Sequence, residues 1–126
     1  MAKNPIAWFE IYVNNMDRAK AFYEAVLDIK LEPLQVPEEP GFSMWSFPAD
    51  MENYGASGAL VHMPGFEAGG NSTLVYFACD DCALEESRVA AAGGTVQREK
   101  MSIGQYGYIS LAIDTEGNML GLHSMK

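Results

Sequence analysis

Hydrophobic and polar positions along this chain follow an order that occurs twice. Residues 6–13 are rich in β-branched and aromatic side chains, which favours a strand. Asn14 and Asn15 then give a turn and helix-capping signal. The hydrophobic residues that follow recur at the spacing of one helix face: Ala19, Phe22, Tyr23, Val26 and Leu27. Beyond a proline-rich loop region, residues 42–47 and 58–63 are predicted to be strands.

The same order begins again after residues 64–72, which contain three glycines and resemble a linker. Residues 73–79 predict a strand, Asp80 and Asp81 a cap, and residues 82–92 a helix that ends at Gly93 and Gly94. Strands are predicted over 95–98, 106–113 and 119–123, with a turn at 115–118. Asp80 lies 66 residues after Asn14, so we infer an internal repeat.

The repeat predicts the fold class α+β, with two tandem βαβββ modules over about 5–64 and 72–125. A single module of this kind cannot bury the face of its sheet alone. We therefore expect the modules to form one domain over residues 1–126, with a cupped mixed sheet. In this arrangement the helices cover the outer face of the sheet, and the other face of the strands lines a cup.

Composition narrows the range of partners and compartments. A chain of 126 residues with 48% hydrophobic residues suits one packed domain. Its net charge of −9 argues against binding nucleic acid or an anionic membrane surface, and favours a neutral or cationic ligand. The longest wholly apolar run, residues 74–79, is too short to cross a bilayer, and no run near the start has signal-peptide length. We therefore expect a cytoplasmic protein with reduced thiols.

Glu10 is the main candidate for chemistry, because it is a carboxylate within an otherwise apolar strand. By the two-residue period of a strand, Trp8 and Tyr12 share its face, whereas the alternate positions are all apolar and should face the helices. Trp8, Glu10 and Tyr12 are then expected in the cup. Glu10 could anchor a ligand or act as a general base with a raised pKa. The alternative is a partly solvated carboxylate paired with a tyrosine or with backbone N–H groups.

The two histidines and two cysteines give weaker signals. His123 on the last predicted strand could donate a hydrogen bond or a proton, whereas His62 at a strand end suits the surface better. A metal bound by His62, His123 and Glu10 would form a two-histidine, one-carboxylate triad, but no local spacing supports it. Cys79 and Cys82 form a C-x-x-C without the second pair that a zinc site needs. Two aspartates between them oppose thiolate formation, so packing is the favoured interpretation.

Aromatic side chains could line a pocket for a planar or apolar ligand, although ordinary sheet packing explains each of them equally well. The tyrosines outside the first strand that could contribute are Tyr76, Tyr106 and Tyr108. Tyr76 has the strongest case, because in the second module it occupies the position of Glu10 in the first. The candidate ligand-binding residues are therefore Trp8, Tyr12, Tyr76 and His123, with Glu10 as the candidate catalytic residue.

Several segments together resemble the vicinal oxygen chelate superfamily, which includes glyoxalase I, bleomycin-resistance proteins and extradiol dioxygenases. Residues 13–23, followed by Val26 and Leu27, resemble its first strand–helix unit. Residues 114–118 resemble its D-x-x-G-N turn before the last strand, and residues 91–94 fit the end of its second helix. Residues 103–108 and 121–122 are similar to a glyoxalase-like subgroup. The resemblance covers almost the whole chain and implies a fold of paired βαβββ modules.

The resemblance also implies a divalent metal held by histidines and carboxylates, which lets adjacent substrate oxygens chelate it. The corresponding positions in this sequence are Trp8, Leu74, Gly121 and a position near Ala59. None of these residues offers a metal ligand. We therefore predict no metal and no other cofactor, and we do not expect metal-dependent glyoxalase I activity.

Two functions of different classes follow from the resemblance and from the candidate residues. One is a glyoxalase-like lyase or isomerase that works without metal, with Glu10 moving a proton on a small organic substrate held by Trp8, Tyr12 and Tyr76. The alternative is a non-catalytic protein that binds or sequesters a small hydrophobic or aromatic compound. By analogy with the superfamily, we also expect a homodimer.

Overall fold

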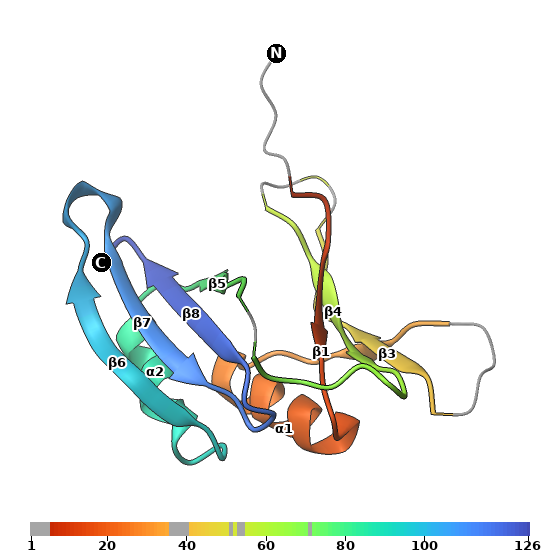
Figure 1. Ribbon diagram of the computed structural model, residues 1–126. Helices are drawn as coiled ribbons and strands as arrows, with labels where there is room; N and C mark the ends of the chain where they lie inside the picture. The colour runs from red at the N-terminus through yellow and green to blue at the C-terminus, as the bar shows by residue number, and fades with distance from the viewer. Residues whose placement is uncertain (1–5, 36–40, 51, 53–54, 71) are drawn as a thin grey trace.

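The computed structural model describes residues 6–35, 41–50, 52, 55–70 and 72–126, and it contains two βαβββ modules as predicted (Figure 1). The elements of the first module are β1 (Phe9–Tyr12), α1 (Met16–Leu27), β2 (Glu32–Pro33), β3 (Ser43–Ser46) and β4 (Gly58–His62). Those of the second are β5 (Val75–Ala78), α2 (Cys82–Val89), β6 (Thr95–Ser102), a 3-10 turn (Gly104–Tyr106), β7 (Tyr108–Ile113) and β8 (Met119–Ser124).

Strand pairing divides the strands into two mixed sheets of four strands each. Their orders are β1-β4-β3-β2 and β5-β8-β7-β6, so the two modules have the same topology. In each sheet the first strand of the module pairs in parallel with the last strand, and the other pairs are antiparallel. β1 and β5 are both edge strands, and no pairing among the described residues joins the two sheets.

The strand registers confirm the predicted equivalence of Glu10 and Tyr76. Glu10 lies opposite Ala59 in the β1–β4 pair, and Tyr76 lies opposite Gly121 in the β5–β8 pair. The residues after these strands also correspond. The Val13 N–H donates to the carbonyl oxygen of β4 at Val61 (2.9 Å), just as the Cys79 N–H donates to that of β8 at His123 (2.7 Å).

Both helices begin at the predicted capping residues. The Asn15 side chain accepts a hydrogen bond from the Arg18 N–H (3.0 Å), and the Asp81 side chain accepts one from the Ala83 N–H (3.0 Å). The second helix is shorter than the predicted 82–92, because residues after Val89 form tighter turns. The Gly94 N–H returns to the Val89 carbonyl oxygen (3.0 Å), which closes the helix end.

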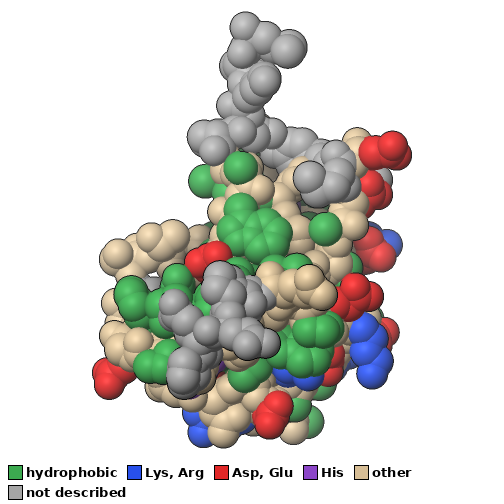
Figure 2. Space-filling model, turned by 90° about the vertical axis from the view of Figure 1, so that its right-hand side faces the viewer, with side chains coloured by type: hydrophobic (Ala, Val, Ile, Leu, Met, Phe, Trp, Pro, Cys, Tyr) green, Lys and Arg blue, Asp and Glu red, His purple; other side chains and the backbone are tan. Residues whose placement is uncertain are grey.

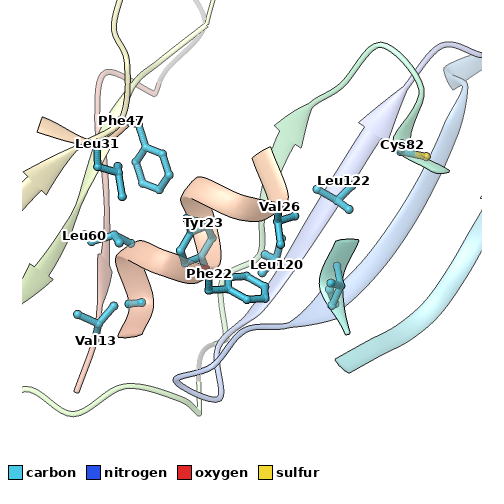
Figure 3. Packing of buried hydrophobic residues seen from close by; sticks show 13 residues of the cluster. Val13, Phe22, Tyr23, Val26, Leu31, Phe47, Leu60, Cys82, Leu120 and Leu122 are labelled. Carbon is cyan, nitrogen blue, oxygen red and sulfur yellow. The ribbon is translucent and has the colours of Figure 1, made fainter. Parts of the chain in front are cut away.

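The hydrophobic core lies between the two sheets, with α1 running through it (Figure 3). Phe22, Tyr23 and Val26 of α1 are fully buried. They pack in one cluster with Leu60 of the first sheet and with side chains of β8, so a single core joins the two modules. α2 packs against α1 and against β6, β7 and β8. No helix among the described residues is both long and apolar enough to cross a membrane.

Candidate functional site

Alternation along β1 separates a core face from an outer face, as predicted. Phe9 and Ile11 pack against the core, and Val13 after them is fully buried. Trp8 and Glu10 are exposed on the other face.

Glu10 is held by its two neighbours on the outer face. The Trp8 indole Nε1–H donates to Glu10 Oε2 (3.3 Å), and the Tyr12 hydroxyl donates to Glu10 Oε1 (3.0 Å). The hydrogen bond to Glu10 is the largest cause of a raised pKa at Tyr12, followed by burial and the Glu10 charge. The Tyr12 phenol therefore stays protonated and keeps donating at neutral pH. Each oxygen of Glu10 is oriented by an aromatic donor and retains capacity to accept another hydrogen bond.

A pocket of about 450 Å³ opens beside Glu10, at the junction of the two modules. Its walls come from the end of β1, the linker at residues 65–69, and the first residues of β5 and β8. The side chains that give it chemical character are Glu10, Tyr12, Phe66, Glu67, Asn118 and Met119. The rings of Tyr12 and Phe66 lie 5.6 Å apart between centroids. A pocket with two carboxylates and an aromatic pair suits a planar ligand that is neutral or cationic.

Asn118 fixes the wall of this pocket from the second module. Its side-chain Nδ2 donates to the Tyr12 carbonyl oxygen (3.0 Å), and its Oδ1 accepts from the Gly69 N–H of the linker (2.7 Å). The D-x-x-G-N turn was recognised in the sequence, but Asn118 was not predicted to take part in the site. Its partners lie far away along the chain, so no local pattern could have identified them.

Tyr76 and His123 lie on the outer face of the second sheet and do not line the Glu10 pocket. Tyr76 is 46% exposed, and its ring covers Gly121, where an added Cβ would overlap it. His123 Nε2 is hydrogen-bonded to the Tyr106 carbonyl oxygen (2.7 Å). The structure thus brings Trp8, Glu10 and Tyr12 together, but not the other two candidates.

The candidate metal triad is not assembled among the described residues. His62 Nδ1 is hydrogen-bonded to the Gly41 carbonyl oxygen (2.7 Å) at the end of β4, and His123 belongs to the other sheet. Within the described part of the chain, no group of three or more His, Cys, Asp and Glu side chains is placed to hold a metal.

The four positions that correspond to the superfamily's metal ligands also do not fit a metal. Trp8 presents an indole N–H that donates to Glu10, while Leu74, Ala59 and Gly121 carry no nitrogen, oxygen or sulfur in their side chains. Ala59 and Gly121 are buried within their sheets. These residues give no basis for a reaction step through a metal at that place.

Both cysteines have the character of packed side chains. Cys82 is fully buried at the start of α2, and both thiols are free. Burial, followed by the negative charge of Glu85, raises the pKa of Cys79 to about 12. A thiol that stays protonated at neutral pH is a weak nucleophile and a poor metal ligand.

Most of the chain matches a known protein family. The model of the Glyoxalase/Bleomycin resistance protein/Dioxygenase superfamily matches residues 5–122. The chain is 30% identical over 112 residues to a Mycobacterium bovis protein named "Putative glyoxylase CFP32", and equally to its Mycobacterium tuberculosis counterpart. The match covers 89% of this chain but only 41% of those curated relatives, so the chain spans about two fifths of their length.

Solved structures show the same fold at low sequence identity. Glyoxalase I from Zea mays has a TM-score of 0.73 at 23% identity, over 93% of this chain and 43% of that one. A glyoxylase/bleomycin resistance protein/dioxygenase domain from Frankia sp. has a TM-score of 0.71 at 14% identity, over 99% and 100% of the two chains. Together with the family match, these likenesses give the same answer as the repeated modules and the D-x-x-G-N turn. The chain belongs to the glyoxalase, bleomycin resistance protein and dioxygenase superfamily.

Proposed function

We propose that the protein binds a small planar organic molecule, neutral or cationic, in the pocket beside Glu10. The observation that carries this proposal is the fixed carboxylate of Glu10, whose two oxygens accept hydrogen bonds from Trp8 and Tyr12 at the edge of a pocket of about 450 Å³. That volume falls within the range of small-molecule sites, and the paired rings of Tyr12 and Phe66 offer a surface for stacking.

Sequestration fits this geometry better than proton transfer by Glu10. The carboxylate is exposed and held by protein donors, so it is arranged to accept a hydrogen bond from a ligand. A carboxylate that acts as a general base usually lies in a site closed to water, whereas Glu10 is exposed. We therefore assign Glu10 the role of a ligand anchor, with Tyr12 as its positioning partner.

A thermal-shift screen of planar heteroaromatic and small carbonyl compounds, followed by calorimetry on the hits, tests this function. We expect the best ligand to lose about tenfold or more in affinity with Glu10→Gln, because a charged acceptor is replaced by a neutral one. Glu99→Gln is the matched control, since it removes the same charge from an exposed glutamate that does not line the pocket, and it should leave the affinity unchanged.

The same experiment separates binding from catalysis. Each hit is incubated with the protein and followed for product by mass spectrometry, alongside elemental analysis of protein purified without chelator. Unchanged ligand and metal-free protein are the expected results. Turnover that Glu10→Gln abolishes would instead establish a lyase or isomerase, and a stoichiometric metal would contradict metal independence.

We further propose that the protein is a homodimer. The outer faces of both sheets carry exposed hydrophobic side chains, Trp8 on the first and Tyr76 on the second. Figure 2 views the molecule from the side of the first sheet and shows hydrophobic side chains on this face, with acidic side chains both beside them and along the right-hand margin. Exposed hydrophobic residues that a second copy could cover include Trp8 of the first module, Phe66 of the linker, and Tyr76 and Met101 of the second module.

A further inference from the structure

A second pocket, separate from the Glu10 site, lies between the two sheets near the end of α1. It has a volume of about 240 Å³. Its apolar walls include Phe9 of β1, Leu27 and Ile29 from the end of α1, Phe47 after β3, and Phe77 of β5. All of these side chains belong to the core-facing side of their elements. This pocket therefore opens on the opposite side of β1 from Trp8 and Glu10.

Aromatic contacts make the floor of this pocket rigid. The ring centroids of Phe47 and Phe77 lie 5.4 Å apart, and that of Phe9 lies 5.5 Å from Phe47 and 5.9 Å from Phe77. Tyr23 packs edge-on against Phe47 from below, with centroids 5.6 Å apart. A pocket walled by packed rings holds its shape without a ligand and favours a compact apolar body.

One carboxylate breaks this apolar lining. Glu85 of α2 lines the pocket, and its Oε1 atom is buried without a hydrogen-bond partner among the described residues. The two nearest basic side chains in sequence have other partners: Arg88 donates to the Val26 carbonyl oxygen (3.1 Å), and Arg98 donates to the Met101 sulfur (3.5 Å). A buried carboxylate oxygen without a donor is costly, and most such groups in proteins have one.

The adjacent thiol interacts with the Glu85 carboxyl group but leaves its Oε1 atom without a partner. Burial, the negative charge of Glu85 and a hydrogen bond with its carboxyl group together raise the pKa of Cys79. The Cys79 thiol also donates to the Phe77 carbonyl oxygen, at 3.6 Å. A ligand with a positively charged donor would complete the hydrogen bonding of Glu85 Oε1.

We propose that this pocket binds a compact hydrophobic amine, whose ammonium group donates to Glu85 Oε1 while its apolar body packs among Phe9, Phe47 and Phe77. An ammonium offers both the donor and the positive charge that the buried carboxylate lacks. The net charge of −9 favours a cation over an anion. The volume, smaller than that of most drug-sized sites, suits a single ring with a short chain. This inference does not depend on the function proposed for the Glu10 pocket.

Calorimetry with 2-phenylethylamine on the 126-residue chain tests the proposal, with 2-phenylethanol and 3-phenylpropionate as neutral and anionic counterparts. We expect the amine to bind more tightly than the alcohol and the carboxylate to show no binding. Glu85→Gln should weaken the affinity for the amine by about tenfold or more, because it removes a charge-assisted hydrogen bond. Glu99→Gln, at an exposed glutamate of β6, removes the same charge elsewhere and should not change the affinity.

Two further measurements locate the amine and guard against a folding defect. In the unmodified protein, the methyl NMR signals of Leu27 and Ile29 should shift as amine is added. Glu10→Gln should leave the affinity for the amine unchanged, since Glu10 belongs to the other pocket. The proposal is overturned if alcohol and amine bind equally well, if these methyl signals do not move, or if Glu10→Gln rather than Glu85→Gln weakens binding.

Discussion

Glu116 makes the densest set of polar contacts among the described residues, and it joins the two modules. Its Oε1 accepts the backbone N–H groups of Asn14 (2.9 Å) and Asn15 (2.8 Å), where α1 begins. Its Oε2 accepts hydrogen bonds from the Arg18 Nε–H (2.6 Å) and from the Thr115 hydroxyl (3.0 Å). The side chain of Glu116 is fully buried, while that of Arg18 is half-exposed. A single carboxylate of the second module thus satisfies donors at the first turn of α1.

Replacement of Glu116 by glutamine is expected to destabilise the protein by about 2–4 kcal/mol. The amide nitrogen would face at least one donor, and the remaining oxygen could not serve all of the others. Urea denaturation followed by circular dichroism measures the change. Asp17→Asn is the matched control, because Asp17 is an exposed carboxylate in the same first turn of α1. An equal loss in both variants would contradict the special role of Glu116.

Glu116 should also make stability depend on pH. Burial alone would raise its pKa, but the hydrogen bonds from Arg18, Asn15, Thr115 and Asn14 outweigh burial and hold the pKa below the ordinary value of 4.5. The folded state therefore binds a proton at Glu116 less readily than the unfolded state does. The contribution of the Glu116 carboxylate to the free energy of unfolding is therefore complete above pH 4.5. It is lost as the pH falls through the lowered pKa. The stability difference between wild type and Glu116→Gln should shrink over this range in urea titrations.

Single residues were predictable where the signal was local. The two-residue period of β1 correctly placed Phe9, Ile11 and Val13 toward the core, and it grouped Trp8 and Tyr12 with Glu10. Glu116 could not be found in this way, since Asn14 lies 102 residues before it in the chain. A buried acid in a turn looks like an ordinary exposed turn residue until the fold brings its donors together.

At the scale of elements, the two modules differ where β1 and β5 meet their parallel partners. In the first pair, Ala59 lies opposite Glu10, so this position of β4 accommodates the methyl group of an alanine. In the second, Gly121 lies opposite Tyr76, whose ring occupies the space above the glycine. The larger side chain on β5 therefore requires the smallest residue on β8.

We expect Gly121→Ala to destabilise the protein by about 1–3 kcal/mol, because the added methyl group overlaps the Tyr76 ring. Tyr76→Ser removes the ring, so the double variant Tyr76→Ser/Gly121→Ala should recover most of the stability lost by the glycine substitution. Thermal denaturation of the four proteins completes a double-mutant cycle. Purely additive effects would show that the ring and the glycine are not coupled.

The boundaries of elements were predicted less well than their order. β6 extends to Ser102 rather than residue 98, although residues 99–102 have no clear alternation. Contacts with α2 anchor this extension: the Lys100 N–H donates to Glu86 (2.6 Å), and its ammonium pairs with Asp81 (2.8 Å). These contacts depend on how α2 packs on the sheet, which the local sequence does not contain.

At the scale of the whole molecule, the repeat predicted two βαβββ modules in one cupped architecture, but not the individual contacts that join them. The order of elements in each module follows from the local periodicity of hydrophobic residues. The arrangement of the modules depends on the shared core around Phe22 and Tyr23 and on the contacts of Glu116 and Asn118. Such long-range contacts leave no periodic trace in the sequence.

The proposed homodimer makes a prediction at this scale. One chain has a mass of 13.8 kDa. Light scattering coupled to size-exclusion chromatography should give twice this mass. Tyr76→Arg places a charge on the exposed outer face of the second sheet and should shift the protein to a monomer. Leu84→Arg changes a hydrophobic residue of α2 that is more exposed than Tyr76, and it should leave the dimer intact. A monomeric wild type, or dissociation by Leu84→Arg alone, would contradict the proposed interface.

The reliance of α1 on a carboxylate from the second module has a consequence for cutting the chain. A break in the linker between residues 64 and 72 would give two fragments with the same topology. Each fragment would lose a different interaction partner. The N-terminal fragment would keep α1 but lose the acceptor for the N–H groups of Asn14 and Asn15. The C-terminal fragment would keep Glu116 but lose the cation that compensates its buried charge. The two pieces are therefore suited to reassemble with each other rather than to fold as independent copies of one ancestral half.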